Sequence, residues 1–135
     1  MEEIRKLLKI SLYVKFVGKK TQKQLPNYYN SAEIVLMPSQ YESFGIIALE
    51  AMACAVPVIV TDAAGVSGLL DKEHNFLLTS ANNPIRLARK INDLLSNKSK
   101  YNKTSKEVFE RVANLSWENV ACKFTKVLNE INFPT

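Results

Sequence analysis

The chain has 135 residues, of which 47% are hydrophobic and 23% are charged, with a formal net charge of +5. This apolar content suffices for one core, so a single domain is expected. No apolar run approaches the roughly 18 residues of a membrane-spanning helix. The start, M-E-E-I-R-K-L-L-K, is charged and amphipathic rather than a signal peptide, which favours a cytoplasmic location. Nucleic acid is not expected as a partner, because aromatic and basic residues are not interleaved and no reading motif occurs.

The predicted elements alternate between helices and strands along most of the chain. In chain order we predict a helix over 2–9, a strand over 12–17, a helix over 24–31, strands over 33–37 and 57–61 with a helix over 44–54 between them, a strand over 76–79, and helices over 84–96, 104–114 and 117–131. This alternation is typical of parallel βα units with helices on the faces of the sheet, so the fold class is α/β.

Two of the C-terminal helices have clear start signals. Asn83 is an expected N-cap followed by Pro84 at the first helical position, and Ser116 is the expected cap of the last helix. The lysine-rich stretch over 98–106 is interpreted as a solvated loop and helix start. The apolar stripe of the last helix, which includes Trp117 and Phe124, either packs on its own sheet or forms a surface for a partner.

The remaining reactive and charged residues give weaker signals. Cys54 and Cys122 are interpreted as reduced thiols in the core. His74 is assigned no role, because nothing near it in sequence completes a catalytic or metal-binding set. A basic cluster occupies the first 23 residues. It is either an ordinary solvated face or a surface that meets anionic lipid or a phosphorylated ligand, with peripheral membrane contact as the consequence.

The most informative stretch is P-S-Q-Y-E-S-F-G-I-I-A-L-E-A-M-A-C, over 38–54, which follows a short apolar strand. It predicts a polar loop and then a helix. Gly45 would let the backbone approach a ligand, and the N–H groups over 43–47 would point outward at the positive end of the helix dipole. Such a helix start can hold an anion such as a diphosphate. Glu42 and Glu50 stand eight residues apart and would bracket that anion.

Taken alone, this pair has an equally simple explanation. Glu42 can be an ordinary carboxylate favoured by the helix dipole, and Glu50 a solvated helix residue. The flanking sequence favours the first interpretation. It consists of V-K-F-V-G at 14–18, Y-Y-N-S-A-E-I-V-L-M-P-S at 28–39, P-V-I-V-T at 57–61 and S-W at 116–117.

Together with the E-x7-E stretch, these segments resemble the donor-binding C-terminal domain of retaining GT-B glycosyltransferases of family GT4, over nearly the whole chain. The resemblance implies a Rossmann-like three-layer α/β/α fold with a mostly parallel sheet. It implies a nucleotide diphosphate hexose, based on UDP, GDP or ADP, as the donor substrate, and neither a cofactor nor a metal. The acceptor would be a saccharide or a lipid-linked saccharide.

The resemblance also implies roles for individual residues. Glu42 would contact the transferred sugar as the catalytic-site carboxylate, and Glu50 would hold the ribose hydroxyls. The loop of Val17, Gly18 and Lys19 would lie beside the base. The sugar and diphosphate would be bound mainly through the backbone of four consecutive residues, Ser43, Phe44, Gly45 and Ile46.

The sequence departs from the family pattern at four positions. Glycine is usual where Ala55 and Ala64 stand and near Asn75, and a carboxylate is usual at or near Gly68. Asparagine tolerates the left-handed conformation that glycine would supply. The departures at Ala64 and Gly68 concern the loop that follows the 57–61 strand.

A larger departure lies at the front of the chain. The resemblance implies a diphosphate-clamping Arg and Lys, two neighbouring strands and an acceptor-binding N-terminal domain before residue 12, and this chain begins too late to contain them. The 12–17 strand would therefore lack its neighbour, and an unpaired strand is unfavourable in water. We expect the strands to pair anew, the chain to self-associate, or another chain to supply strands.

Two functional hypotheses follow. In the first, residues 1–135 are a partial donor domain that takes part in hexosyl transfer with retention, although these residues alone are expected to be inactive. In the second, the chain is a non-enzymatic binding module or subunit that needs a partner carrying the acceptor domain. A degenerate fragment without function is a poorer third alternative.

Overall fold

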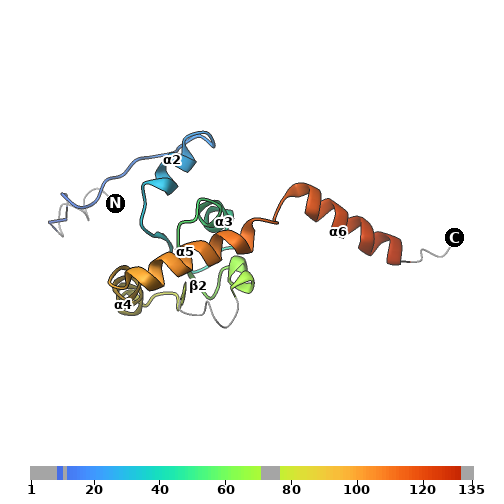
Figure 1. The fold of residues 1–135 in the computed structure, drawn as a ribbon. Coiled ribbons are helices and arrows are strands. Elements are labelled where there is room, and N and C mark those ends of the chain that lie inside the picture. Colours follow the sequence, from blue (N-terminus) through green and yellow to red (C-terminus); the bar gives the residue numbers. More distant parts are fainter. Residues whose placement is uncertain (1–8, 11, 71–76, 132–135) are drawn as a thin grey trace.

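The fold is built on a small parallel sheet, seen in the computed structural model of the chain (Figure 1). The structure describes residues 9–10, 12–70 and 77–131. The sheet has three strands in the order β1-β2-β3, with Val35 opposite Val58 and Val60 opposite Leu78. The strands are β1 (Val35–Met37), β2 (Val58–Thr61) and β3 (Leu78–Thr79).

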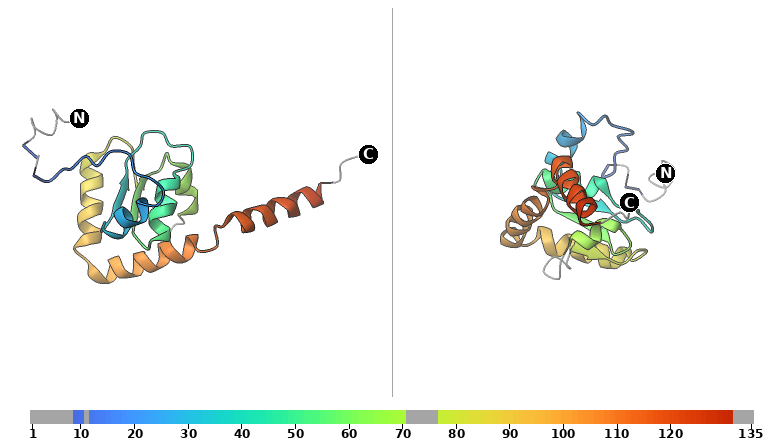
Figure 2. Two further views of the ribbon diagram at one scale, coloured as in Figure 1. Left: turned by 90° about the horizontal axis from the view of Figure 1, so that it is seen from above. Right: turned by 90° about the vertical axis from the view of Figure 1, so that its right-hand side faces the viewer.

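Helices cover both faces of this sheet. In the left view of Figure 2, α3 and α4 lie on opposite sides of the strands, and α5 contacts both of them. α2 packs on α3. The helices are α2 (Leu25–Asn30), α3 (Ile46–Ala53), α4 (Pro84–Leu95), α5 (Lys98–Val112) and α6 (Trp117–Glu130), with a 3₁₀ helix η1 (Gly65–Leu69). The predicted Rossmann-like α/β/α architecture with a parallel sheet is therefore confirmed.

The core lies around β2, the central strand. All four residues of β2 are buried, as expected for a parallel strand with neighbours on both edges and helices on both faces. Met52 from α3, Leu77 before β3 and Leu94 from α4 are each no more than 1% exposed and complete the core from three sides. Because β1 pairs with this buried strand, the segment between β1 and β2 is held at both of its ends.

The predicted caps of α4 and α6 are confirmed. The side chain of Asn83 accepts a hydrogen bond from the backbone N–H of Arg86 at 2.9 Å, and that of Ser116 accepts one from Asn119 at 3.2 Å. Each cap satisfies one of the backbone donors that a helix leaves free at its start.

α3 ends in a turn that explains why glycine would be the usual residue where Ala55 stands. Ala55 has a left-handed φ of 57°, and its N–H bonds to the carbonyl of Met52 at 2.9 Å, while Val56 N–H bonds to Ala51 at 3.0 Å. This pattern of bonds is the Schellman motif, in which glycine is preferred because it has no Cβ.

Replacing Ala55 with glycine is expected to stabilise the domain by about 1 kcal/mol, because a left-handed residue with a Cβ costs about that much. Ala55 is exposed, so no packing is lost. Urea unfolding of Ala55→Gly against the parent chain measures the difference. Ala53→Gly, at the exposed last residue of the same helix, is the control and is expected to destabilise, because glycine is a poor helix former.

The predicted strand over 12–17 is wrong. Tyr13 and Val14 donate backbone hydrogen bonds to the carbonyl of Ile10 in a turn, and the residues that follow join neither edge of the sheet. Leu12 is 93% exposed and Tyr13 is 86% exposed. Residues with high β propensity form a strand only beside a ladder partner, and β1 pairs with β2 alone in the described sheet.

The start of α5 was also predicted wrongly. The segment over 98–106 is helical, because the side chain of Asn97 accepts from the N–H of Lys100 at 2.9 Å and caps a 15-residue helix. Two surface ion pairs at (i, i+4) spacing, Lys103–Glu107 at 3.5 Å and Lys106–Glu110 at 3.7 Å, run along its exposed side. The lysines that suggested a loop are the solvated face of this helix.

α6 does not pack on the sheet, which corrects the first of the two interpretations of its apolar stripe. The helix leads away from the rest of the domain (Figures 1 and 2), and none of its residues is buried. Trp117 is 86% exposed and Phe124 is 63% exposed. Cys122 is consequently exposed rather than in the core, and Cys54 is only half-buried. Some predictions fall outside the described residues. These are the helix over 2–9, of which only Lys9 is described and lies in a turn, and the statements on His74 and Asn75.

Candidate functional site

The loop that carries Glu42 starts at the carboxyl end of β1, the end of a parallel strand where α/β proteins bind ligands. Glu42 is half-buried, and its Oε1 lies 3.4 Å from the backbone N of Phe44, which donates to it. This weak local bond turns the carboxylate toward the start of α3.

The loop is held by the segment that leaves β2. Thr61, which is fully buried, donates its hydroxyl to the carbonyl of Ser39 at 2.7 Å. Further along, Gly65 N–H donates to the carbonyl of Glu42 at 3.2 Å and Val66 N–H to that of Phe44 at 2.6 Å. Despite the departures at Ala64 and Gly68, the segment after β2 thus contacts the Glu42 loop directly, with Ala64 itself paired in an isolated parallel bridge to Glu42.

The start of α3 is open in the way that anion binding requires. Gly45 is the N-cap residue, no side chain caps the helix, and the carbonyl of Gly45 first accepts from Ala48 at 3.0 Å. The N–H groups of Ile46 and Ile47 therefore precede the first intrahelical donor. They lie at the positive end of the helix dipole, where a phosphate oxygen is favoured.

Gly45 has two structural requirements that the sequence did not reveal. Its φ is +92°, and a Cβ at this position would lie 2.7 Å from Cε of Met37 and 3.0 Å from Cγ1 of Val66. The missing side chain therefore allows close packing on the inner side of the loop. This requirement holds whether or not a ligand approaches the outer side.

Glu50 lies in the second turn of α3, is half-buried and has a specific partner. The hydroxyl of Tyr29, on α2, donates to Glu50 Oε2 at 2.7 Å. Only 7% of Tyr29 is exposed. Burial raises the pKa of Tyr29 above its usual range, and the hydrogen bond to Glu50 and the negative charge of Glu50 raise this pKa further.

We expect Tyr29 to stay protonated when the pH passes about 10, the usual pKa of tyrosine in an unfolded chain. Because the pKa of Tyr29 is higher in the folded chain, its contribution to stability is complete below about pH 10. That contribution is lost as the pH rises toward the folded-state pKa. Ultraviolet absorbance of tyrosinate, followed against pH beside a Tyr29→Phe variant, isolates its titration. A tyrosine signal near pH 10 that vanishes in the variant would contradict the buried bond.

The predicted base-side loop contains a glycine in the left-handed region. Val17, Gly18 and Lys19 are exposed on the segment before α2, where Gly18 has a φ of +65°. Within the described part of the chain, no hydrogen bond joins this loop to Glu42 or Glu50. The proposed roles of the loop and of both carboxylates remain predictions.

Large apolar side chains surround the open helix start. Tyr41 is 84% exposed, Phe44 47%, Ile46 62% and Ile47 54%. These four apolar side chains, from the Glu42 loop and the first turn of α3, are exposed to solvent beside the proposed site.

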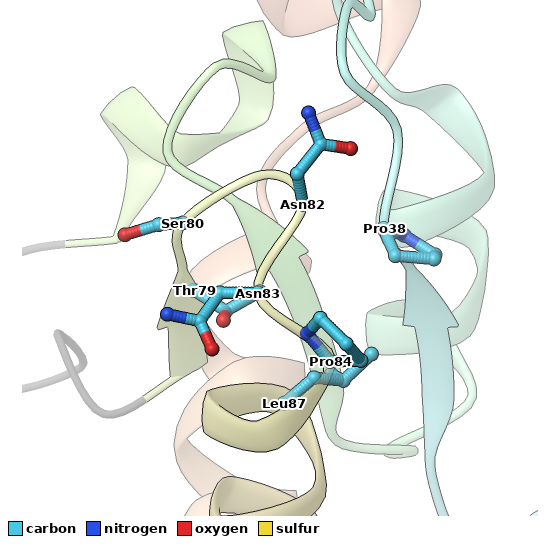
Figure 3. Close-up of a pocket in the computed structure, with 7 residues that line it drawn as sticks. All are labelled: Pro38, Thr79, Ser80, Asn82, Asn83, Pro84 and Leu87. Atoms are coloured by element: carbon cyan, nitrogen blue, oxygen red, sulfur yellow. The ribbon is translucent and has the colours of Figure 1, made fainter.

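A separate pocket of about 260 Å³ opens beside this loop (Figure 3). It lies between Pro38, after β1, and the turn from β3 into α4. It includes neither Glu42 nor Glu50, but the turn is joined to the Glu42 loop, because Gln40 Nε2 donates to Asn82 Oδ1 at 2.7 Å. The lining residues are Pro38, Thr79, Ser80, Asn82, Asn83, Pro84 and Leu87.

Two residues that shape the site were missed by the sequence analysis. Tyr29 was noted only as part of a motif, and Gly65 was not singled out. The only sequence signal for Tyr29 is its place in the Y-Y-N-S motif. That motif does not indicate its hydrogen-bond partner Glu50, which is 21 residues further along the chain. In the described ranges, no cluster of three or more His, Cys, Asp or Glu side chains could hold a metal ion, and no helix is long and apolar enough to cross a membrane.

The chain has relatives of known class. The family described as "Glycosyl transferases group 1" matches residues 1–111. The D-inositol 3-phosphate glycosyltransferase of Corynebacterium urealyticum is 30% identical over 131 residues, 97% of this chain and 31% of the relative. An uncharacterised glycosyltransferase of Methanocaldococcus jannaschii is 36% identical over 114 residues, 82% of this chain and 28% of the relative.

Solved structures agree with this class. Sucrose-phosphate synthase from Thermosynechococcus elongatus has a TM-score of 0.85 at 31% identity, covering 96% of this chain and 33% of the synthase. Anabaena HepE, in complex with UDP and glucose, shares the fold with a TM-score of 0.77 at 23% identity, covering 96% of this chain and 35% of HepE. The chain spans about a third of the length of the curated relatives it matches. It belongs to the group 1 glycosyl transferases, with the GT-B type of fold.

Proposed function

We propose that residues 42–50 form one wall of a donor site that binds a nucleotide diphosphate hexose for transfer with retention. The observation that carries this proposal is the uncapped start of α3, with a half-buried carboxylate before it and another one turn into the helix. The acceptor is proposed to be a saccharide or a lipid-linked saccharide. Relatives named for glycosyl transfer and for sucrose-phosphate synthesis support the class of reaction.

In this proposal each part of the wall has its own task. Glu42 positions the transferred sugar, and Glu50 accepts hydrogen bonds from the ribose. The backbone over 43–46 binds the sugar and diphosphate, and its first-turn N–H groups stabilise negative charge on the departing diphosphate. The exposed loop of Val17, Gly18 and Lys19 lies beside the base in this proposal. No cofactor or metal takes part.

Titration with UDP, GDP and ADP at millimolar concentration, followed by amide-resolved NMR, tests the site. We expect at least one nucleotide to perturb Gly45, Ile46 and Glu50, and Glu50→Gln to weaken binding about tenfold, the worth of a hydrogen bond to a charged acceptor. Glu130→Gln, which removes the same charge at the end of the distant α6, is the control. If no nucleotide perturbs Gly45 or Glu50, the proposed site is wrong.

A second candidate function is that of a binding subunit that acts beside a partner carrying the acceptor domain. The exposed stripe of α6 and the exposed side chains of Leu12 and Tyr13 favour it. The expected results are no sugar transfer from UDP-, GDP- or ADP-glucose by the 135 residues alone and concentration-dependent association in light scattering. Sugar transfer by the chain alone would exclude this candidate. A monomer stable to dilution, with amides over 12–17 protected from exchange, would count against the association.

A further inference from the structure

The hydrogen bond from Tyr29 to Glu50 joins a buried, rigid donor to the carboxylate assigned to the ribose. The ring of Tyr29 is held between α2 and α3, and its residue is 7% exposed. Its hydroxyl lies 2.7 Å from Glu50 Oε2. A bond to a charged acceptor at this distance is at the strong end of the range for proteins.

This bond restricts a side chain that is otherwise mobile. Glutamate has three rotatable side-chain bonds, and Glu50 is only half-buried, so packing alone does not fix its carboxylate. With Oε2 held by Tyr29, Oε1 and the second lone pair of Oε2 stay available as acceptors. A vicinal diol offers two donors at the spacing that two oxygens of one fixed carboxylate can accept.

We propose that Tyr29 is a positioning residue that holds Glu50 in the orientation in which it accepts hydrogen bonds from the ribose hydroxyls of a bound nucleotide. The inference rests on the proposed function, since it takes Glu50 as the ribose acceptor. Tyr29 itself touches no ligand; it removes the ordering cost of Glu50 before the ligand arrives. A purely structural bond between α2 and α3 would have no effect that depends on the ribose.

The test compares UDP with 2′,3′-dideoxy-UDP, which lacks both ribose hydroxyls, using the full chain and amide-resolved NMR titration. For the parent chain we expect UDP to bind about tenfold more tightly than the dideoxy compound. Tyr29→Phe removes one oxygen and keeps the ring. It is expected to weaken the binding of UDP about five- to tenfold and to leave the affinity for the dideoxy compound unchanged. A double variant that also carries Glu50→Gln should lose little further affinity for UDP.

Tyr28→Phe is the matched control, because Tyr28 is on the same helix, is 40% exposed and lies under the ammonium of Lys20 rather than beside Glu50. It should retain the full preference for UDP. If Tyr29→Phe weakens the binding of UDP and of dideoxy-UDP equally, Tyr29 has a structural role only and the inference is overturned. An unchanged preference for UDP would overturn it too, while leaving the donor site intact. If the parent chain binds no nucleotide, the proposed function itself fails and the inference with it.

Discussion

Gly65→Ala is expected to destabilise the domain by about 2–4 kcal/mol and to displace the Glu42 loop. A Cβ on Gly65 would lie 2.3 Å from the carbonyl oxygen of Ser43 and 3.0 Å from Cα of Phe44. Both neighbours are backbone atoms, which cannot rotate away as the end of a side chain can. Relief of the clash therefore requires the loop and the 3₁₀ turn to separate, with loss of the bonds from Gly65 to Glu42 and from Val66 to Phe44.

Gly68→Ala is the matched control, because it lies in the same 3₁₀ helix and a Cβ there would meet nothing within 4 Å. Urea unfolding measures both variants, and amide NMR shifts over 42–46 report the position of the loop. We expect Gly68→Ala to leave both nearly unchanged. Equal stabilities for the two variants would show that the loop and the turn are not packed as described.

Met52→Ala is expected to cost about 2–5 kcal/mol, the range for truncating a buried methionine or leucine to alanine. Met52 is fully buried on the inner side of α3, where it packs in the cluster that includes β2. The cavity left behind would loosen the contact between the helix and the sheet, and α3 carries both Glu50 and the helix start proposed to bind the diphosphate.

Ile85→Ala is the control for this truncation. Ile85 is 66% exposed on α4, so its removal is expected to cost less than about 1 kcal/mol. Urea midpoints of the two variants give the comparison. A loss below 1 kcal/mol for Met52→Ala would mean that α3 is not fixed to the sheet by its buried face.

The sequence predicted those parts of the fold that depend on local signals. An Asn-Pro pair at the start of α4, a serine before Trp117 and a run of four β-branched residues at β2 are each readable within a few residues. The segment over 12–17 has equally strong strand composition but forms none, because a strand also needs a neighbour, and composition does not report one.

The candidate site divides in the same way. Glu42, Gly45 and Glu50 could be selected because they share one loop and helix. The contacts that hold them come from elsewhere in the chain. Tyr29 precedes Glu50 by 21 residues, and Gly65, which packs on Ser43, comes after β2 in the sequence. Such pairs exist only once α2, β1 and β2 are assembled, so a single sequence gives their residues without their partners.

The bonds from Thr61 to Ser39 and from the 3₁₀ turn to Glu42 and Phe44 also bear on the kinetics of binding. They fix the loop backbone to the exit of the central strand without help from a ligand. If the proposed donor site is correct, a nucleotide would meet a loop that these bonds already hold in place. We would then expect its rate of association to be set by diffusion and charge, and differences in affinity among nucleotides to appear in their rates of dissociation.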